Sequence, residues 1–195
     1  MRRWLVTGPT AAGKSAVTGL LAARGAAVLD GDRLGHDVLR LPAVAAAVAA
    51  RFGAGCAPGG VVDRARLGAV VFNDAGALAD LDAITHPELC RAMEDGLRAL
   101  ESQGHGLAVL EAAVYFRLPA PPRMDLVVAV VASPEVRVAR LASRTGLDAA
   151  AVRARIDALA PLDRDWGRAD VTIRNDGGQA ELAAAVDAFW AAHAP

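Results

Sequence analysis

Residues 8–15 constrain this chain more than any other segment, because they match the pattern GxxxxGK[ST] in full. A strand-length apolar run ends at Thr7 just before them, and a helical pattern follows from Ser15 to Arg24. Glycine at the first and sixth positions lets the backbone curl so that successive N–H groups point at phosphate oxygens, and the following helix turns its positive end to the same charge. The segment therefore predicts a loop that binds the phosphates of ATP or GTP.

The residue types inside this loop indicate how the phosphates are held. Lys14 is placed to reach the β- and γ-phosphates, and the Ser15 hydroxyl is placed to ligate Mg²⁺. Backbone N–H groups supply the other contacts, so the expected nucleotide-binding positions are Gly8, Ala11, Ala12, Gly13, Lys14, Ser15 and Ala16. A glycine loop that preceded a helix by chance would not combine the full pattern with this strand–loop–helix order.

Strand-length apolar runs alternate along the chain with longer helical patterns, which is typical of an α/β fold with a parallel sheet. The runs contain Val, Leu and Ala with little polar alternation, as expected for strands that are covered on both faces. We expect five strands, at about residues 4–7, 26–29, 107–110, 126–131 and 171–173. This pattern predicts a three-layer P-loop NTPase fold with a five-stranded parallel sheet, as a single domain over residues 1–195.

A long stretch between the second and third expected strands, about residues 33–104, contains helical patterns only. Three helix starts are indicated by proline at the first helical position or by a capping aspartate, and they lie at Pro42, Asp63 and Pro87. We expect the last of these helices to run to about Ser102. An insertion of helices between two strands usually forms a subdomain over the strand ends, so we expect this one to bind the acceptor.

The composition excludes several classes of protein. The 195 residues carry a net charge of −1 with both signs interspersed, which argues against a protein that coats nucleic acid. The two cysteines, Cys56 and Cys90, are too few and too far apart for a CxxC metal site or a disulfide framework. The apolar run at residues 126–132 is too short to span a bilayer, and the N-terminus does not read as a signal peptide. We therefore expect no contact with membranes and a cytoplasmic location.

Two aspartates, Asp30 and Asp32, follow the second expected strand. Sites in open α/β sheets lie beyond the carboxyl ends of the strands, and we expect this strand to lie beside the one that leads into the loop. Asp32 is then placed to act as the general base for the acceptor and to help hold Mg²⁺. Asp30 either belongs to the acceptor site or caps the next helix, and His36 either contacts the acceptor or is a surface or capping histidine.

An arginine-rich helix is expected after the fourth strand, with Ser133 as its N-cap. Arg137, Arg140 and Arg144 are three and four residues apart and therefore line one face. Their guanidinium groups can neutralise charge on the transferring phosphoryl group, although a run of charges can also be a solvated face. We predict a lid at about residues 140–165. Arg140 is expected to be catalytic, and Arg137 and Arg144 are expected to bind the nucleotide.

Sequence elements that the chain lacks exclude several classes of P-loop protein. We find no Asn-Lys-x-Asp element or DxxG switch of a GTPase after a suitable strand, and 195 residues leave little room for an AAA+ or transport ATPase. A short chain with a helical insertion and an arginine-bearing helix is typical of a small-molecule kinase.

Several further segments resemble the dephospho-CoA kinases, and the likeness runs along nearly the whole chain. The segment Val-Leu-Asp-Gly-Asp-x-x-x-His is similar to the family's DADxxxH, and residues 168–177 are similar to its ADxVIxNxG. The other matching segments are the phosphate-binding loop, Arg51-Phe52-Gly53, Val62-Asp63-Arg64 with Leu67 and Val71-Phe72, His86-Pro87 and the arginine helix. The later segments are weak one by one, and their common order and spacing carry the resemblance.

The resemblance implies transfer of a phosphoryl group from ATP, with Mg²⁺, to the ribose 3′-hydroxyl of dephospho-CoA, the last step of coenzyme A synthesis. It implies that Asp32 is the base and that Arg140 contacts the phosphates. It also suggests that the helical insertion handles the CoA moiety, with Arg64 and His86 among its contacts.

Three segments depart from the family's pattern. The loop interior reads Pro-Thr-Ala-Ala, and Ala16 stands where threonine is usual. The family's PLLFE appears as residues 113–117 with Arg117 in place of a carboxylate, and Leu159 stands in place of a usual glutamine. Because the loop contacts are backbone N–H groups, the first departure is compatible with phosphate binding. The second and third bear on acceptor and lid contacts and not on the class of reaction.

Other functions compete with this interpretation. The loop also resembles that of tRNA dimethylallyltransferases, which are much longer chains with an insertion for a tRNA stem. A nucleoside-monophosphate or shikimate-type kinase would share every phosphate-handling residue, whereas the acidic pair and the arginine helix disfavour a regulatory module without turnover. We expect a monomer or a small homo-oligomer, in which the apolar face of residues 182–190 packs on the sheet or, alternatively, forms an interface.

Overall fold

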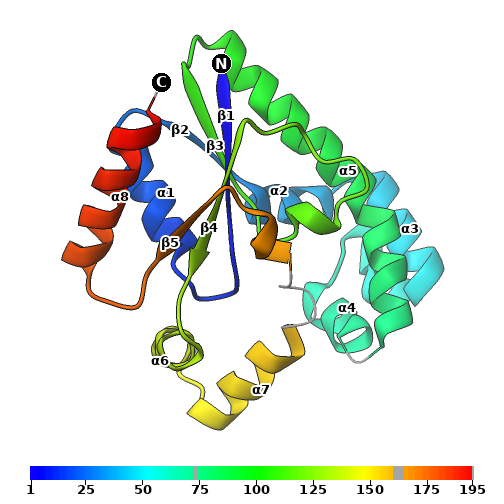
Figure 1. Cartoon of the computed structure of the whole chain (residues 1–195). Helices are drawn as coiled ribbons and strands as arrows, with labels where there is room; N and C mark the ends of the chain where they lie inside the picture. Colours follow the sequence, from blue (N-terminus) through cyan, green and yellow to red (C-terminus); the bar gives the residue numbers. More distant parts are fainter. Residues whose placement is uncertain (73, 160–164, 195) are drawn as a thin grey trace. The chain divides into compact units, whose positions relative to one another are not determined.

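The structure is a computed structural model that describes residues 1–72, 74–159 and 165–194 (Figure 1). It divides into two compact units. The first contains Met1–Asp30, Gly96–Arg117 and the chain from Arg123 onward, and the second contains Gly31–Asp95 and Leu118–Pro122. The described part of the first unit holds a five-stranded, all-parallel sheet in the order β2-β3-β1-β4-β5, which confirms the predicted fold class.

The three central strands are β1 (Arg2–Thr7), β3 (Leu107–Glu111) and β4 (Leu126–Val131). β1 lies between the other two and pairs with both in parallel register. Trp4, Leu5 and Val6 are fully buried, as expected for a strand that is covered on both faces. The edges are formed by β2 (Ala27–Asp30) and β5 (Val171–Arg174), in which every second residue is exposed.

The strand order corrects one of our expectations. We expected β2 to lie beside the strand that leads into the phosphate-binding loop, but β3 lies between them. A crossover between parallel strands passes over a face of the sheet and can skip a position, so hydrophobic patterns do not reveal which strands are neighbours. The carboxylate that ends the strand next to β1 is therefore Glu111, and Asp30 ends the strand beyond it.

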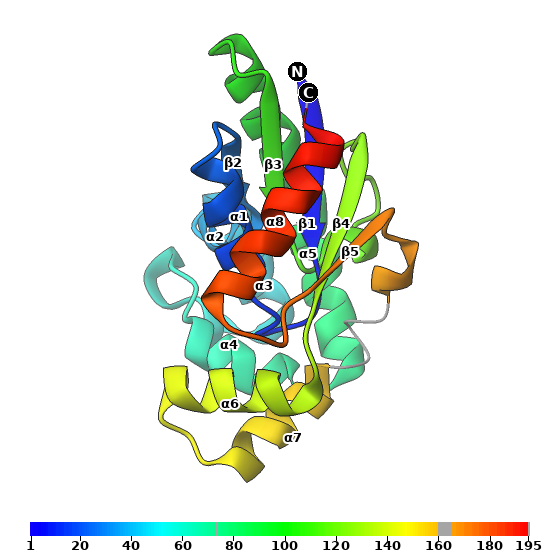
Figure 2. The ribbon, with the colours of Figure 1, turned by 60° about the vertical axis from the view of Figure 1, so that its left-hand side comes forward.

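One face of the sheet is covered by α1 (Lys14–Ala22) and α8 (Gln179–His193), as Figure 2 shows. Leu182, Val186 and Phe189 of α8 are buried against this face. The Phe189 ring meets the Trp4 ring edge-on, with 5.2 Å between their centroids. Of the two alternatives for the C-terminal helix, the structure therefore supports packing on the sheet.

Two further helices of the first unit, α6 (Pro134–Thr145) and α7 (Ala149–Leu159), follow β4. Ser133 caps α6 as predicted, because its hydroxyl accepts a hydrogen bond from the N–H of Val136 at 3.4 Å. The two helices share a small apolar cluster made of Val138, Leu141, Val152 and Ile156. Part of the predicted lid, residues 160–164, lies outside the described residues.

The second unit is helical, as predicted for the insertion. It contains α2 (Gly31–Val38), α3 (Pro42–Phe52), α4 (Arg64–Val71) and most of α5 (Ala75–Ser102). Pro42 is the first residue of α3, and the Asp63 carboxylate caps α4 by accepting from the N–H groups of Ala65 and Arg66 at 3.0 and 3.1 Å. The domain boundaries that we drew from the sequence stay a prediction.

The expected helix start at Pro87 is wrong, because α5 begins twelve positions earlier and continues through this proline. Asp74 provides the start, since its Oδ1 accepts from the N–H groups of Gly76 and Ala77 at 2.8 and 3.1 Å. A proline inside a helix removes one backbone donor and does not have to end a helix of 28 residues that is held at its other turns.

Within the described ranges, none of the helices combines the length and apolarity that crossing a membrane requires.

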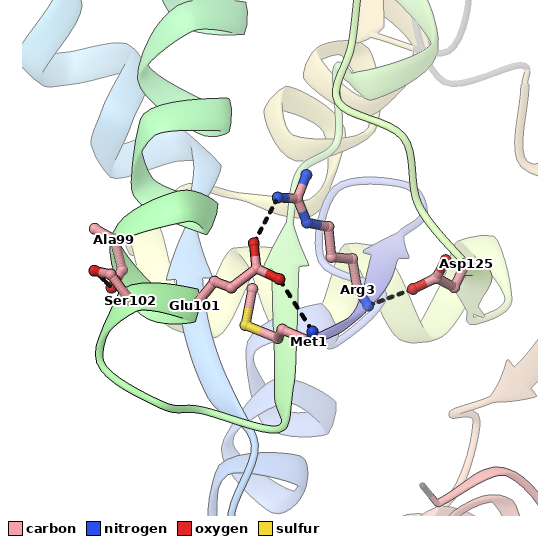
Figure 3. A network of polar contacts seen from close by, with 6 residues as sticks. All are labelled: Met1, Arg3, Ala99, Glu101, Ser102 and Asp125. Carbon is pink, nitrogen blue, oxygen red and sulfur yellow. Dashed lines mark hydrogen bonds and ion pairs between the residues drawn. The ribbon is translucent and has the colours of Figure 1, made fainter.

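A polar network joins the amino end of β1 to the last turn of α5 and to the start of β4 (Figure 3). The N-terminal ammonium group of Met1 donates to Glu101 Oε1 at 3.1 Å, and the Arg3 guanidinium lies 3.6 Å from Glu101 Oε2. The Arg3 N–H donates to Asp125 Oδ2 at 2.8 Å. The hydrogen bond and charge of the ammonium group lower the pKa of Glu101 from its ordinary value. This network stabilises the end of the sheet that is opposite to the strands' carboxyl ends.

Candidate active site

The loop between β1 and α1 has the curled backbone that its sequence predicts. Gly8, Ala11 and Gly13 all have positive φ angles, of 136°, 63° and 101°. A Cβ atom at Gly8 would lie 2.1 Å from the carbonyl oxygen of Val130, and one at Gly13 would lie 2.1 Å from Asn175 Nδ2. Glycine is required at both positions because the loop passes this close to its neighbours.

Ala11 is the non-glycine residue of the loop with a left-handed backbone, which costs about 1–2 kcal/mol for an L-residue. Its methyl group packs against the apolar cluster of α6 and α7. The Pro-Thr-Ala-Ala interior, one of the departures from the family's pattern, is therefore accompanied by apolar contact between the loop and these two helices.

Two loop carbonyls are held from outside by side chains that come from distant parts of the chain. Arg137 Nε donates to the carbonyl of Thr10 at 2.8 Å, and Asn175 Nδ2 donates to the carbonyl of Ala12 at 2.8 Å. A trans peptide bond points its carbonyl and the next N–H in opposite directions. The N–H groups of Ala11 and Gly13 are therefore turned to the other side of the loop, where they can meet phosphate oxygens.

Arg140 lies next to the same part of the loop. Its guanidinium donates to the carbonyl of Ala12 at 3.4 Å, to Asn175 Oδ1 at 3.2 Å and to the carbonyl of Gly177 at 3.4 Å. Arg137 is buried, whereas Arg144, at the end of the same helix, is exposed. Of the three predicted arginines, two therefore contact the phosphate-binding loop or the loop that follows β5.

Lys14 and Ser15 stand at the start of α1. Lys14 Nζ donates to the carbonyls of Gly8 and Pro9 at 3.0 and 3.3 Å, so its ammonium group lies at the phosphate-binding loop. The Ser15 hydroxyl donates to Glu111 Oε1 at 2.8 Å. A hydroxyl and a carboxylate that meet in this way provide the oxygen ligands that Mg²⁺ prefers.

Glu111 is a candidate site residue that we did not predict from the sequence. It is the last residue of β3 and is aligned in the sheet with Val6 of β1 and Asp30 of β2. The signal was present, because an apolar run at residues 107–110 ends in a carboxylate at the carboxyl end of a parallel strand. Asn175 was likewise part of a matching segment, but nothing in its pattern assigned it to a loop carbonyl.

The predicted acceptor residues are placed as follows. Asp30 is the exposed last residue of β2 in the first unit. Asp32 lies in the first turn of α2 and His36 in its last turn, and both are exposed members of the second unit. Arg64 is the exposed first residue of α4. His86 is buried, with its Nε2 atom 3.2 Å from Asp82 Oδ1.

Arg117 and Leu159 both depart from the family's pattern, and the structure describes the surroundings of the first only. Arg117 ends a short 3-10 helix, Tyr115–Arg117. The Phe116 ring in this helix lies under the Arg168 guanidinium, with 4.6 Å between the guanidinium carbon and the ring centroid. The side chain of Leu159 lies outside the described residues.

A glycine-curled loop between the central strand and its helix, with a lysine, a hydroxyl–carboxylate pair and an arginine around it, is the phosphate-handling arrangement of P-loop kinases. Residues 5–181 match the family model described as dephospho-CoA kinase. The chain belongs to the dephospho-CoA kinase family.

Individual relatives agree with this assignment. The chain is 40% identical to the dephospho-CoA kinase of Anaeromyxobacter dehalogenans, over 95% of this chain and 89% of that one. It is 35% identical to that of Geobacter sulfurreducens, over 97% and 98%. Among solved structures it is similar to TT1252 from Thermus thermophilus, with a TM-score of 0.74 and 31% identity over 100% of this chain and 98% of that one.

Proposed function

We propose that this protein transfers the γ-phosphoryl group of ATP to the ribose 3′-hydroxyl of dephospho-CoA, which yields coenzyme A and ADP. In this reaction the acceptor oxygen forms a bond to the γ-phosphorus, the bond from that phosphorus to the β–γ bridging oxygen breaks, and the hydroxyl proton passes to a base. The observation that carries the proposal is the loop whose N–H groups are turned to one side by Arg137 and Asn175, in a chain of this family.

The loop and its neighbours are assigned to the nucleotide. The Lys14 ammonium and the loop N–H groups hold the β- and γ-phosphates. Of the predicted positions, Ala12 and Ala16 already donate their N–H groups to the carbonyls of Pro9 and Gly13, at 3.2 and 3.1 Å. The N–H groups assigned to the phosphates are therefore those of the other predicted positions, Gly8, Ala11, Gly13, Lys14 and Ser15. Arg140, whose guanidinium already lies beside the Ala12 carbonyl, stabilises charge that develops on the transferring group. Arg144 is assigned to the same phosphates on the basis of its position one turn further along α6.

The residues at the end of β3 and the start of α1 fit Mg²⁺, because the Ser15 hydroxyl and the Glu111 carboxylate are hard oxygen donors 2.8 Å apart. We assign Ser15 and Glu111, both of the first unit, to this ion. The assignment of Asp32 to Mg²⁺ rests on the sequence alone. When bound with ATP, Mg²⁺ would neutralise charge on the phosphate oxygens.

Asp32 is assigned as the base. It follows the carboxyl end of β2 by two residues and is exposed, so that its carboxylate can accept a proton. Asp30, His36, Arg64 and His86 are assigned to the acceptor on the basis of the family resemblance. The Asp82 carboxylate supports the assignment of His86, because a carboxylate at 3.2 Å orients the imidazole ring. A cytoplasmic location and a monomer or small homo-oligomer stay predictions.

The test is ADP formation by the full chain with ATP-Mg²⁺ and, in separate reactions, dephospho-CoA, shikimate or nucleoside monophosphates. A further reaction with tRNA and a prenyl donor is followed by release of diphosphate. We expect ADP with dephospho-CoA only, and a product that co-elutes with coenzyme A. The Lys14→Met variant, which retains the length of the side chain without its charge, controls for a contaminating kinase. Turnover of another acceptor without turnover of dephospho-CoA would contradict the proposal.

A further inference from the structure

Thr18 is a buried polar residue of α1 with no part in the predicted site. It lies three positions after Ser15 and is 3% exposed. Its hydroxyl lies 2.8 Å from Glu111 Oε2 and 3.3 Å from the carbonyl oxygen of Ser15. A hydroxyl has one proton to donate, and the shorter contact to an ionised carboxylate is the stronger of the two. Thr18 therefore donates to Glu111.

The Glu111 carboxylate is thus held at both oxygens by hydroxyls from successive turns of α1. Oε1 accepts from Ser15 and Oε2 accepts from Thr18, each at 2.8 Å. A glutamate side chain turns about three bonds, and a single hydrogen bond to Ser15 leaves the carboxylate free to rotate about that contact. The second hydrogen bond fixes the plane of the carboxylate and therefore the direction in which its remaining lone pairs point.

We propose that Thr18 is a positioning residue, which holds the Glu111 carboxylate against Ser15 and thereby raises the affinity of the protein–nucleotide complex for a divalent cation. This inference rests on the proposed function, specifically on the assignment of Ser15 and Glu111 to Mg²⁺. Thr18 does not contact the ion and acts only through the orientation of Glu111.

A purely structural role gives a different expectation. Threonine inside a helix commonly bonds to a carbonyl one turn earlier, and its loss would then affect the stability of α1 but not metal binding. A change in cation affinity without a change in affinity for metal-free nucleotide therefore separates the two roles.

The experiment compares the full chain with its Thr18→Val and Thr18→Ser variants. Valine has the shape of threonine without the hydroxyl, and serine retains the hydroxyl. Mn²⁺ binding is measured in the presence of saturating ADP from the electron paramagnetic resonance signal of free Mn²⁺. ADP affinity is measured by calorimetry in excess EDTA, and folding by circular dichroism.

We expect Thr18→Val to weaken Mn²⁺ binding about tenfold, the loss that corresponds to one hydrogen bond to a charged group. ADP affinity in EDTA should change less than about twofold, and Thr18→Ser should restore Mn²⁺ affinity to within about threefold. In a Glu111→Gln background, Thr18→Val should have no further effect on Mn²⁺ affinity, because the two residues act as a unit.

Unchanged Mn²⁺ affinity in a folded Thr18→Val protein would overturn the inference, as would an equal loss of ADP affinity in EDTA. If Thr18→Val does not fold, Thr18→Ala is measured with the same expectation and the same overturning results. Because the assay contains no acceptor, a positive result with a protein that fails to phosphorylate dephospho-CoA would sustain this inference while the proposed function fails.

Discussion

Asn175 Nδ2 donates a hydrogen bond of 2.8 Å to the carbonyl of Ala12, which lies 163 positions earlier in the chain. The contact is buried and joins the loop that follows β5 to the phosphate-binding loop. The other end of the same amide, Oδ1, accepts from Arg140. One side chain therefore fixes both a loop carbonyl and the arginine that we assign to the transferring phosphoryl group.

Replacement of Asn175 by alanine should weaken ATP binding about tenfold. The substitution leaves the Ala12 carbonyl with a longer contact to Arg140 and lets the next peptide rotate, and loss of a buried hydrogen-bond partner costs about 1–3 kcal/mol. The measurements are the KM for ATP and the dissociation constant of ADP. Asn175→Asp is the matched variant, since it retains Oδ1 for Arg140 and loses the Nδ2 donor, and wild-type affinity in Asn175→Asp would contradict the role of this hydrogen bond.

Gly13 should tolerate no side chain. A Cβ atom there would lie 2.1 Å from Asn175 Nδ2, and the φ angle of 101° disfavours any L-residue. Gly13→Ala should therefore lower the free energy of unfolding by more than about 2 kcal/mol and abolish detectable binding of ADP.

Gly19 supplies the control for this prediction, in the helix that begins just after Gly13. It lies inside α1 with open space where a Cβ would stand. Gly19→Ala should raise the free energy of unfolding by about 0.4–1 kcal/mol, because alanine restricts the unfolded chain and favours helix. Equal destabilisation by both substitutions would show that the helix, and not the approach of Asn175, is sensitive.

A comparison of the loop glycines with Asn175 and Glu111 shows which features of the site the sequence could predict. The motif predicts the positive φ angles of Gly8 and Gly13, because a backbone conformation is a local property, but not their close approach to Val130 and Asn175. The roles of Asn175 and Glu111, like the position of β2 in the sheet, depend on which strands are neighbours. The order of the strands follows from the packing of helices on the sheet and not from local sequence pattern. The predicted helix start at Pro87 is wrong for the same reason, since the contacts of α5 along its whole length determine whether the helix continues through a proline.

Arg140→Ala should lower kcat by about 100-fold with a smaller effect on ADP affinity. The guanidinium is half-buried beside the loop, where charge–charge interactions are stronger than in water, and removal of one donor to a developing charge typically costs 10²–10³ in rate. Arg153→Ala on the exposed surface of α7 is the control and should leave kcat unchanged. An unaffected rate in Arg140→Ala would limit this arginine to its hydrogen bonds with the two loops and contradict a role in phosphoryl transfer.

Asp32→Asn should lower kcat by about 100-fold or more while the affinity for ATP stays nearly the same. A general base contributes roughly 10²–10⁴ in rate, and asparagine retains the shape of aspartate without its basicity. The measurements are single-turnover kinetics with dephospho-CoA and calorimetry with ATP. An equal loss of rate and of affinity would place Asp32 in nucleotide or metal binding instead.

Asp176 should make the stability of the protein depend on pH in the acidic range. The Ser133 N–H donates to its Oδ1 at 2.6 Å, and this hydrogen bond is the main cause that lowers the pKa of the carboxyl from its ordinary value, with Arg174 contributing less. A lowered pKa in the folded state means that the carboxylate stabilises the protein above its unfolded pKa, near 3.9, and loses this contribution as pH falls through the folded value.

Asp176→Asn retains an acceptor for the Ser133 N–H and removes only the charge. Its urea midpoint should therefore lie below that of the wild type at pH 7, and the difference should shrink as the pH is lowered through the range below about 4. Because the main partner is a backbone N–H rather than an exposed ion, 0.5 M salt (about three times physiological ionic strength) should leave most of the difference at pH 7. A difference that does not change with pH, or that salt abolishes, would assign the effect to Arg174 or to general charge and not to the Ser133 hydrogen bond.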